Sequence, residues 1–447
     1  MTNTDLRTRI AAELPGVLDD LARLVAIPSI SAQPEHADDV RASAEAVAAL
    51  FRGAGCPDVR VVEAGGQPAV VGHYPAPEGR PTVCLYAHHD VQPTGPVEEW
   101  SSDPFAVTER DGRLYARGVA DDKAGIAVHL AALRAFDGRP PVGVTIFVEG
   151  EEELGSPTMP AFLDAYGDEL RADAFVICDS GNWEVGRPSF TTTLRGLAEV
   201  VVEVRTLGHA LHSGMFGGVV PDALTTLVTL LGTLTDADGS VAVDGLTTAE
   251  VAHLDYPPDR LRAETSLLDG VELVGTGSVV ERLWAKPSLS VLALDATPVA
   301  KASNTLAPVA RAKVSVRLAP NQDAAAALAA LQRHLTERAP FGARVTFPHA
   351  HAAAGSVIDV DGPLAREAVA ALGEAWGVEP LRIGQGGSIP LAGELAARMP
   401  GMEVLLTGVL DPHARAHGID ESLDLGDFGK AALGEALWLE RLGSRDA

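Results

Sequence analysis

The sequence predicts an α/β protein: a mixed, largely parallel sheet flanked by helices, with a smaller α+β domain inserted. Three observations predict this. Buried strand-like runs alternate with helical segments as far as Asp179, which is typical of parallel strands joined by helices. From Leu197 polar and apolar residues alternate instead, as in an antiparallel strand with one exposed face. The first pattern returns from about Asp359, and 447 residues are too many for one ordinary core.

Apolar residues at helical spacing predict helices, and short β-branched runs bounded by turn formers predict strands. The expected helices are Asp5–Ile27, Ala37–Gly53, Ile126–Phe136, Met159–Tyr166, Pro221–Leu234, Asp323–Arg338, Pro363–Trp376 and Asp427–Arg441. The expected strands are Arg60–Val62, Ala69–Tyr74, Pro81–Ala87, Val142–Val148, Ala174–Cys178, Leu197–Thr206, Leu289–Ala293, Ala312–Leu318, Arg344–Phe347 and Val404–Thr407. We also expect a hairpin from 100–107 and 113–115, and a Gly-rich turn at 384–389.

These elements divide the chain into two domains. Residues 1–190 and 353–447 form the larger domain, and residues 191–352 form the insertion. The order strand–helix–strand–strand–helix–strand in the insertion predicts a ferredoxin-like arrangement with one open face. Residues 237–287 interrupt it with an irregular segment that carries no clear pattern.

The composition excludes several classes of partner. With 35 basic and 61 acidic residues the net charge is −26, and no basic stretch stands out, so nucleic acid and anionic membranes are not expected partners. The three cysteines are widely spaced without a CxxC motif, which fits a reducing compartment. The first residues lack the apolar run of a signal peptide, and no apolar stretch is long enough to cross a membrane. We therefore expect a cytoplasmic protein.

Carboxylates and imidazoles follow several of the expected strands. His88 and Asp90 follow Pro81–Ala87, Glu152 and Glu153 follow Val142–Val148, and Asp179 follows Ala174–Cys178; Asp121 and His417 complete the set. Because the carboxyl ends of parallel strands meet at one edge of a sheet, these groups can converge. Crowded carboxylates resist ionising together, so such a cluster usually needs a cation. The ligand set suits zinc, with manganese or cobalt as alternatives, and the excess of carboxylates favours two ions about 3.5–4 Å apart.

Each group also has a simpler explanation. The acidic run Glu149–Glu153 could be a solvated turn, His88 a hydrogen-bonded core histidine, and Asp121 a helix cap. Asp179 could cap a turn, and His413 could replace His417 as the ligand. The common sheet edge and the following Asp122 favour the metal site over a helix cap for Asp121. The place of His417 before Gly418 and Glu421 favours it over His413.

The motifs resemble those of a known family. His88-His89-Asp90-Val91-Gln92-Pro93, Gly118-Val119-Ala120-Asp121-Asp122-Lys123, Glu152-Glu153 before Gly155-Ser156, Asp179 after a strand, and the late His417 are similar, in order, to those of the co-catalytic zinc metallopeptidases that include aminoacylases, carboxypeptidase G and carnosinases. The resemblance spans about Cys84 to Glu421. Its dipeptidase branch fits best, through Leu211–Gly218 and Gly386–Pro390.

The resemblance implies roles for the metal-site residues. Asp121 would bridge two Zn²⁺ ions, with His88 and Asp179 on one ion and Glu153 and His417 on the other. Asp90 would fix the tautomer of His88. Glu152 would be the general base on the bridging water. The family also has a cis peptide at the position of Asp121–Asp122. Here Ala124 separates Lys123 from the glycine that the family has directly after the lysine, and Asp420 stands in the place of the family's asparagine before Glu421.

The resemblance also assigns roles in the insertion, which would be a lid and dimerisation domain. His212 would reach across a homodimer interface to stabilise the oxyanion. Arg317 would grip the carboxylate of a small-molecule substrate, with Asn304, Thr305, Gly387 and Ser388 as further contacts. Arg317 could instead pair with an acid of its own sheet. The expected activity is that of a dipeptidase. The alternatives are an N-acyl-amino-acid deacylase of the acetylornithine or succinyl-diaminopimelate type, and a non-catalytic peptide or metal binder.

Overall fold

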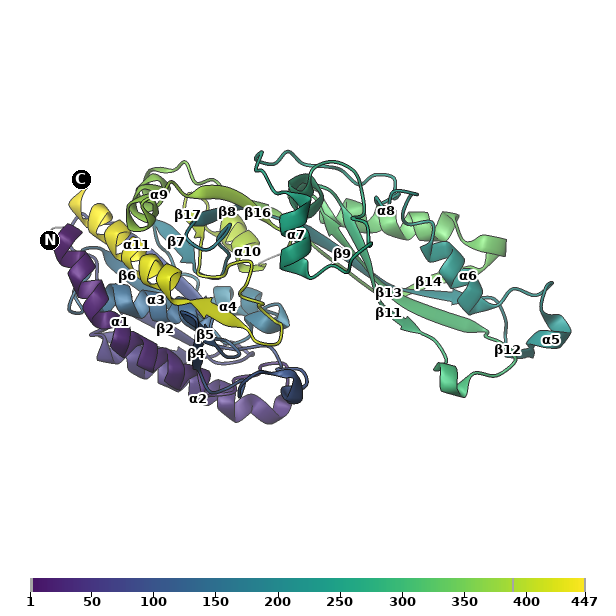
Figure 1. Ribbon diagram of the computed structural model, residues 1–447, viewed down its shortest axis with the longest axis horizontal. Coiled ribbons are helices and arrows are strands. Elements are labelled where there is room, and N and C mark those ends of the chain that lie inside the picture. Colours follow the sequence, from purple (N-terminus) through teal and green to yellow (C-terminus); the bar gives the residue numbers. More distant parts are fainter. Residues whose placement is uncertain (1–2, 388–389, 446–447) are drawn as a thin grey trace. The chain divides into compact units, whose positions relative to one another are not determined.

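The computed structural model describes residues 3–387 and 390–445 (Figure 1). It divides into two compact units, 1–192 with 358–383 and 390–447, and 193–357 with 384–389. The sequence placed 384–389 with the larger domain, and this assignment is wrong for 384–387; residues 388–389 lie outside the described residues. Residues 381–385 form a strand, β16 (Leu381–Gln385), instead of a turn, and Gly384 lies so close to Trp284 of the second unit that a Cβ would come within 2.7 Å of the indole.

The first unit is built on a mixed six-stranded sheet in the order β1-β2-β6-β3-β7-β17. Strands β6, β3, β7 and β17 are parallel, whereas β1 and β2 are antiparallel additions at one edge. Its strands are β1 (Asp58–Val62), β2 (Ala69–Tyr74), β3 (Thr82–His88), β6 (Gly143–Glu149), β7 (Ala174–Ile177) and β17 (Glu403–Leu406). The prediction of a largely parallel sheet is confirmed.

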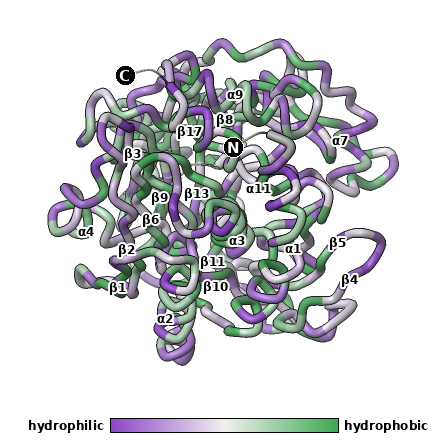
Figure 2. The backbone as a smooth tube through the Cα atoms, turned by 90° about the vertical axis from the view of Figure 1, so that its left-hand side faces the viewer, coloured by the Kyte–Doolittle hydropathy of each residue, from purple (hydrophilic) through white to green (hydrophobic). Residues whose placement is uncertain are grey.

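Helices cover both faces of this sheet. They are α1 (Asn3–Val25), α2 (Ala37–Gly53), α3 (Lys123–Arg134), α4 (Met159–Tyr166), α9 (Pro363–Trp376), α10 (Pro390–Arg398) and α11 (Leu425–Ser444). Helix α3 is hydrophobic along most of its length (Figure 2) because it is enclosed by β3, α1 and α11. On the opposite face, Phe162 of α4 stacks on Phe147 of β6, with ring centroids 4.9 Å apart. The sequence did not predict α10.

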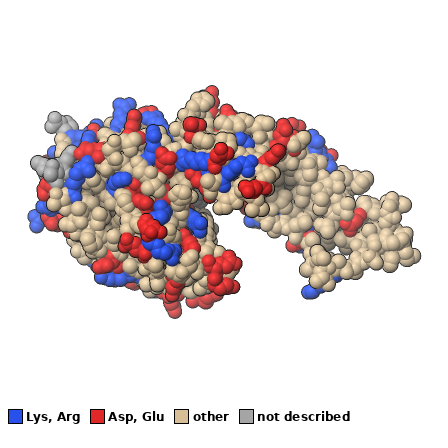
Figure 3. All heavy atoms as spheres, in the orientation of Figure 1, with Lys and Arg blue, Asp and Glu red and all other residues tan. Residues whose placement is uncertain are grey.

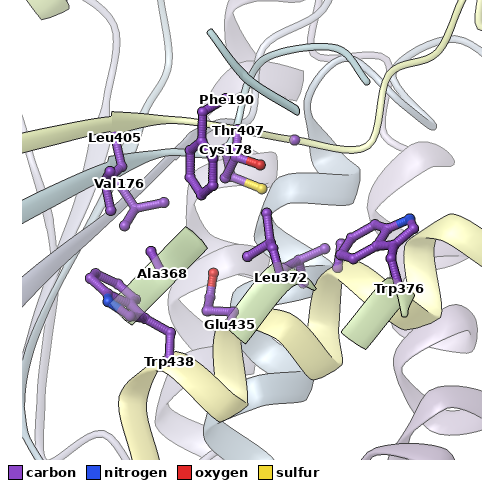
Figure 4. A pocket seen from close by; sticks show the side chains of 13 residues that line it. Val176, Cys178, Phe190, Ala368, Leu372, Trp376, Leu405, Thr407, Glu435 and Trp438 are labelled. Atoms are coloured by element: carbon purple, nitrogen blue, oxygen red, sulfur yellow. The ribbon is translucent and has the colours of Figure 1, made fainter. Parts of the chain in front are cut away.

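A small cavity of about 30 Å³ lies between the sheet and α9 and α11 (Figure 4). Its lining is mostly apolar, with Val176, Leu372 and Trp438 among the side chains and the carboxyl group of Glu435 as an exception. The predicted site residues do not line it. The cavity is therefore a packing feature of the core.

The expected hairpin begins later than predicted. Its strands are β4 (Thr108–Arg110) and β5 (Arg113–Tyr115), and β18 (Ser422–Asp424) pairs with β5. Residues 100–107 form turns instead, because Pro104 has no N–H to donate and Asp103 accepts hydrogen bonds from the backbone of Phe105 and Ala106.

The second unit holds a four-stranded antiparallel sheet in the order β11-β13-β9-β14. Numbered along the chain this order is 2-3-1-4, the ferredoxin-like arrangement. Its strands are β9 (Gly196–Arg205), β11 (Ser288–Asp295), β13 (Val309–Leu318) and β14 (Arg344–Ala353), and α6 (Ala223–Leu231) and α8 (Ala324–Glu337) pack on one face. The smaller elements of this unit are β10 (Leu211–His212), α5 (Ser213–Phe216), α7 (Pro258–Thr265), β12 (Thr305–Leu306) and β15 (Ser356–Val357), and β8 (Ser189–Leu194) crosses the boundary from the first unit to the second.

The surface agrees with the acidic composition. Acidic and basic side chains are mixed over the face of the first unit seen in Figure 3, whereas the end of the second unit that carries α5 shows few charges. Among the described residues, no helix combines the length and apolar character needed to cross a membrane.

Candidate metal centre

The predicted ligands of the first unit converge at the carboxyl edge of its sheet. His88 is the last residue of β3, Asp179 lies just beyond β7, and Glu152 and Glu153 form a 3₁₀ turn after β6. Asp121 directly precedes Asp122, which occupies the N-cap position of α3 without a capping hydrogen bond from its side chain, so Asp121 itself is not the cap. The Asp121–Asp122 peptide bond is cis. One sheet edge thus gathers groups from four separate segments.

Asp121 lies between the two histidines. Its Oδ1 is 3.2 Å from Nε2 of His88, and its Oδ2 is 3.1 Å from Nε2 of His417. His417 Nε2 is also 3.1 Å from Oε2 of Glu153, and His88 Nε2 is 3.9 Å from Oδ2 of Asp179. Each oxygen of Asp121 therefore faces a different imidazole.

These separations suit ligands of a common cation. Two donors that each lie about 2.0–2.1 Å from a tetrahedral ion are roughly 3.3 Å apart. Ligand atoms of His88, Glu152 and Asp179 lie within 4.8 Å of one another, and so do those of His88, Asp121 and Glu153. The structure therefore has the donors and the spacing to hold a divalent metal.

The protonation of the site also indicates a cation. Burial, and then neighbouring carboxylates, raise the pKa values of Glu152 and Asp179 well above their usual range. Hydrogen bonds to Asp121 and Glu153 raise the pKa of His417 to about 10. The imidazole of His417 is therefore protonated at neutral pH and places a positive charge beside these two carboxylates. A bound cation would let these carboxylates ionise together.

Asp90 organises the strand ends around the site. It is fully buried, and its carboxylate accepts hydrogen bonds from Ser31 Oγ at 2.6 Å and from the backbone N–H groups of Glu152 and Glu153 at 3.2 and 3.1 Å. His88 Nδ1 lies 3.1 Å from the backbone carbonyl of Asp90 and 3.4 Å from its Oδ1. This arrangement leaves Nε2 of His88 facing Asp121.

Sequence reasoning missed Arg117. Its buried guanidinium donates to Oε2 of Glu421 at 2.6 Å and to the carbonyl of Gly418 at 3.0 Å. Oε1 of Glu421 in turn accepts the backbone N–H of Asp121 at 3.0 Å. The pair fixes the loop of His417 against the segment of Asp121. The only sequence signal was the charged residue in the otherwise apolar run 114–120.

Two further features bear on questions that the sequence left open. His417 approaches the carboxylates, whereas the hydrogen bonds of His413 within the described part of the chain involve only its backbone, with Asp411 and Ser422. A Cβ on Gly125 would lie 2.5 Å from Oδ1 of Asp122 and 2.8 Å from the backbone carbonyl oxygen of Cys178, so a glycine is favoured here, one residue later than in the family pattern.

The predicted residues of the second unit fall into two groups. His212 and Thr305 are paired in β10 and β12, and the N–H of Ser213 donates to the carbonyl of Asn304. Strand β12 lies just before the start of β13 in the chain. Arg317 lies eight residues after the first residue of β13, which is roughly 25 Å along the strand from that start. Gly387 follows β16, and Ser388 lies outside the described residues.

Comparison with known proteins places this site in a family. Residues 84–440 match the sequence model of peptidase family M20/M25/M40. The chain belongs to this family. It is 34% identical over 430 residues to the cysteinylglycine-S-conjugate dipeptidase of Corynebacterium striatum, covering 95% of this chain and 94% of the relative. It is 28% identical to the Cys-Gly metallodipeptidase dug1 of Schizosaccharomyces pombe, covering 92% of each.

The fold agrees with this membership. Human carnosine dipeptidase 1 superposes with a TM-score of 0.85 at 23% identity, over 100% of this chain and 99% of that one. The M20 chain is therefore a metallopeptidase, a hydrolase that requires a divalent metal.

Proposed function

We propose that this M20 peptidase is a metal-dependent dipeptidase that cleaves the amide bond of dipeptides with a free C-terminal carboxylate. The observation that carries the proposal is the position of Asp121, whose two oxygens face His88 and His417. The dipeptidase names of its relatives support the substrate class. We further propose two Zn²⁺ ions, with His88 and Asp179 on one, His417 and Glu153 on the other, and Asp121 on both.

Each nearby side chain then has a defined task. A bound cation of this kind lowers the pKa of a water molecule and polarises a carbonyl group. Glu152 accepts the proton of the attacking water and later donates it to the leaving amine. Its carboxylate is suited to this because its backbone N–H is fixed by Asp90 and its side chain lies near His88 and Asp179. Asp90 holds the His88 ring in the tautomer that leaves Nε2 free for the metal.

We propose that the protein is a cytoplasmic homodimer that associates through the second unit. His212 lies in the two-stranded sheet of β10 and β12, just before the start of β13, whereas Arg317 lies near the other end of β13. His212 is therefore suited to serve the site of another subunit. Exposed apolar side chains near His212, such as Met215 at 73% and Val219 at 90%, support an interface there. The buried, unpaired cysteines suit a reducing compartment.

A substrate panel tests the activity. Metal-loaded protein is incubated with unblocked dipeptides, including Cys-Gly, and with N-acetyl and N-succinyl amino acids. The proposal expects turnover of dipeptides and little release of acetate or succinate. Preferential deacylation would favour the deacylase alternative, which none of the named sequence relatives supports. Absence of turnover on both classes would favour a non-catalytic binder.

A further inference from the structure

The open face of the second unit carries charged side chains that are mostly paired. Even-numbered residues of β9 and β13, such as Val202 and Val314, are buried against α6 and α8, so the odd-numbered residues point to the other face. There Lys313 pairs with Glu199 at 3.3 Å and Arg311 with Glu203 at 2.6 Å. Two arginines near the C-terminal end of β13, Arg317 and Arg195, have no such acidic partner among the described residues.

Arg317 and Arg195 approach the same point of the sheet. Arg317 is directly opposite Ser288 in the β11–β13 register, so their side chains share a face. Nη1 of Arg195 donates to Oγ of Ser288 at 3.0 Å and to the carbonyl of Lys286 at 3.2 Å. The tip of Arg195 therefore lies beside the residue that faces Arg317.

Neither guanidinium makes an ion pair within the described part of the chain. Arg195 is only 8% exposed, and its Nε has no hydrogen-bond partner there. Burial, and then the charge of Arg317, lower the pKa of Arg195 to about 10. A buried cation without a counter-charge is unfavourable, and a bound anion is the usual compensation.

A glycine-rich segment borders this pair. The backbone N–H of Arg195 donates to the carbonyl of Gln385, and a Cβ on Gly386 would lie 3.3 Å from Nη2 of Arg195. Glycine at this position lets the backbone approach the guanidinium closely. The segment that continues to Gly387 is thus in place to donate backbone N–H groups to an anion.

We propose that Arg195 is the buried second cation of a carboxylate-binding site whose more accessible member is Arg317. Arg195 acts as a positioning residue: its guanidinium holds Ser288 and the backbone carbonyl of Lys286, and its charge strengthens the hold of Arg317 on the carboxylate. That the carboxylate belongs to a dipeptide rests on the proposed function. The existence of the anion site does not.

The test compares a dipeptide with its C-terminal amide on wild type, Arg195→Gln and Arg195→Lys. Arg195→Gln should raise KM for the free acid at least about tenfold, with little change in kcat, because a charge-assisted interaction is lost. The amide should change less than about twofold, and Arg195→Lys should retain part of the effect. Arg311→Gln, which removes a paired arginine from the same face, is the matched control and should leave both KM values unchanged.

An equal loss on acid and amide in Arg195→Gln would mean a structural role only and would overturn the inference. If that variant does not fold, Ser288→Ala provides the same comparison, because it removes only the hydrogen bond that joins Arg195 to the residue beside Arg317. Here too a selective rise in the KM of the free acid supports the site, and equal effects contradict it.

Calorimetric binding of L-alanine and L-alaninamide separates this inference from the proposed function. Wild type should bind L-alanine at least about tenfold more tightly than Arg195→Gln does, and L-alaninamide should not discriminate between them. If this holds and no dipeptide is cleaved, the proposed function fails and the anion site stands. If dipeptides are cleaved with the same KM by wild type and Arg195→Gln, the anion site fails and the function stands.

Discussion

Replacing Asp90 with asparagine should weaken metal binding without unfolding the protein. Oδ2 of Asp90 accepts hydrogen bonds from Ser31 and from the N–H of Glu153, and Oδ1 accepts that of Glu152 and lies 3.4 Å from His88 Nδ1. Asparagine keeps one acceptor oxygen and presents an NH₂ group in place of the other. One buried N–H group is therefore left without an acceptor.

An unsatisfied buried donor costs about 1–3 kcal/mol, a factor of roughly 5 to 150 in an equilibrium constant. Residues that hydrogen-bond to metal ligands typically contribute about 10- to 100-fold to metal affinity, which agrees with this factor. We therefore expect the Kd for Zn²⁺ to rise by about 10- to 100-fold, measured by competition with a fluorescent chelator.

The matched control is Asp427→Asn. Asp427 is as buried as Asp90, and its carboxylate accepts hydrogen bonds from Gly186 N–H and Trp376 Nε1, but it lies in α11 and away from the ligands. Its variant should lose stability and keep the wild-type Kd. The reasoning is refuted if Asp90→Asn binds Zn²⁺ like wild type, or if both variants lose affinity equally.

Three further predictions follow from the same contacts. Glu152→Gln should retain its metal and lose about 10²- to 10⁴-fold in kcat. Glu151→Gln, which affects only the carboxylate bound to Thr158 and Gln67, should keep a kcat within a few-fold of wild type. Similar losses of kcat in both variants would contradict the assignment of Glu152 as the base. Because the pKa of His417 is raised to about 10 and only a neutral imidazole binds metal, metal binding should release a proton and tighten as pH rises towards 10; calorimetry in buffers of different ionisation enthalpy would reveal the proton, and pH-independent binding would argue against His417 as a ligand. Burial lowers the pKa of Lys123 to about 7, so between pH 7 and 10 this side chain binds more protons in the unfolded chain and contributes a rise in the free energy of unfolding, whereas the raised pKa of His417 contributes a fall. Lys123→Met removes only the first contribution, so its free energy of unfolding should fall with pH relative to that of wild type, and an identical pH dependence in both proteins would contradict this role of Lys123.

The part of the site that follows strands was predictable from sequence. His88, Glu153 and Asp179 lie at or just beyond strands β3, β6 and β7, whose buried β-branched runs are local signals. His417 lies in a loop, and only the resemblance to a family placed it. Its approach to Asp121 depends on the Arg117–Glu421 pair, whose members are 304 residues apart and leave no local pattern.

The errors in the fold have a similar origin. The first hairpin strand begins later than expected because Asp103 accepts the backbone N–H of Phe105 and Pro104 has no N–H to donate, so this segment forms a turn. Strands β11 and β14 extend beyond the predicted ranges because β13 and β9 supply the pairing, which is not visible in their own sequences. Residues 384–387 were assigned to the wrong unit because β16 is defined by partners distant in the chain.

A crystal structure of the metal-loaded protein, with anomalous scattering to locate the ions, tests the central claim most directly. We expect two ions, one about 2.0–2.2 Å from Nε2 of His88 and the other at the same distance from Nε2 of His417, each bound to a different oxygen of Asp121. Ions that bind elsewhere, or a metal that leaves Asp121 without contact, would contradict the account.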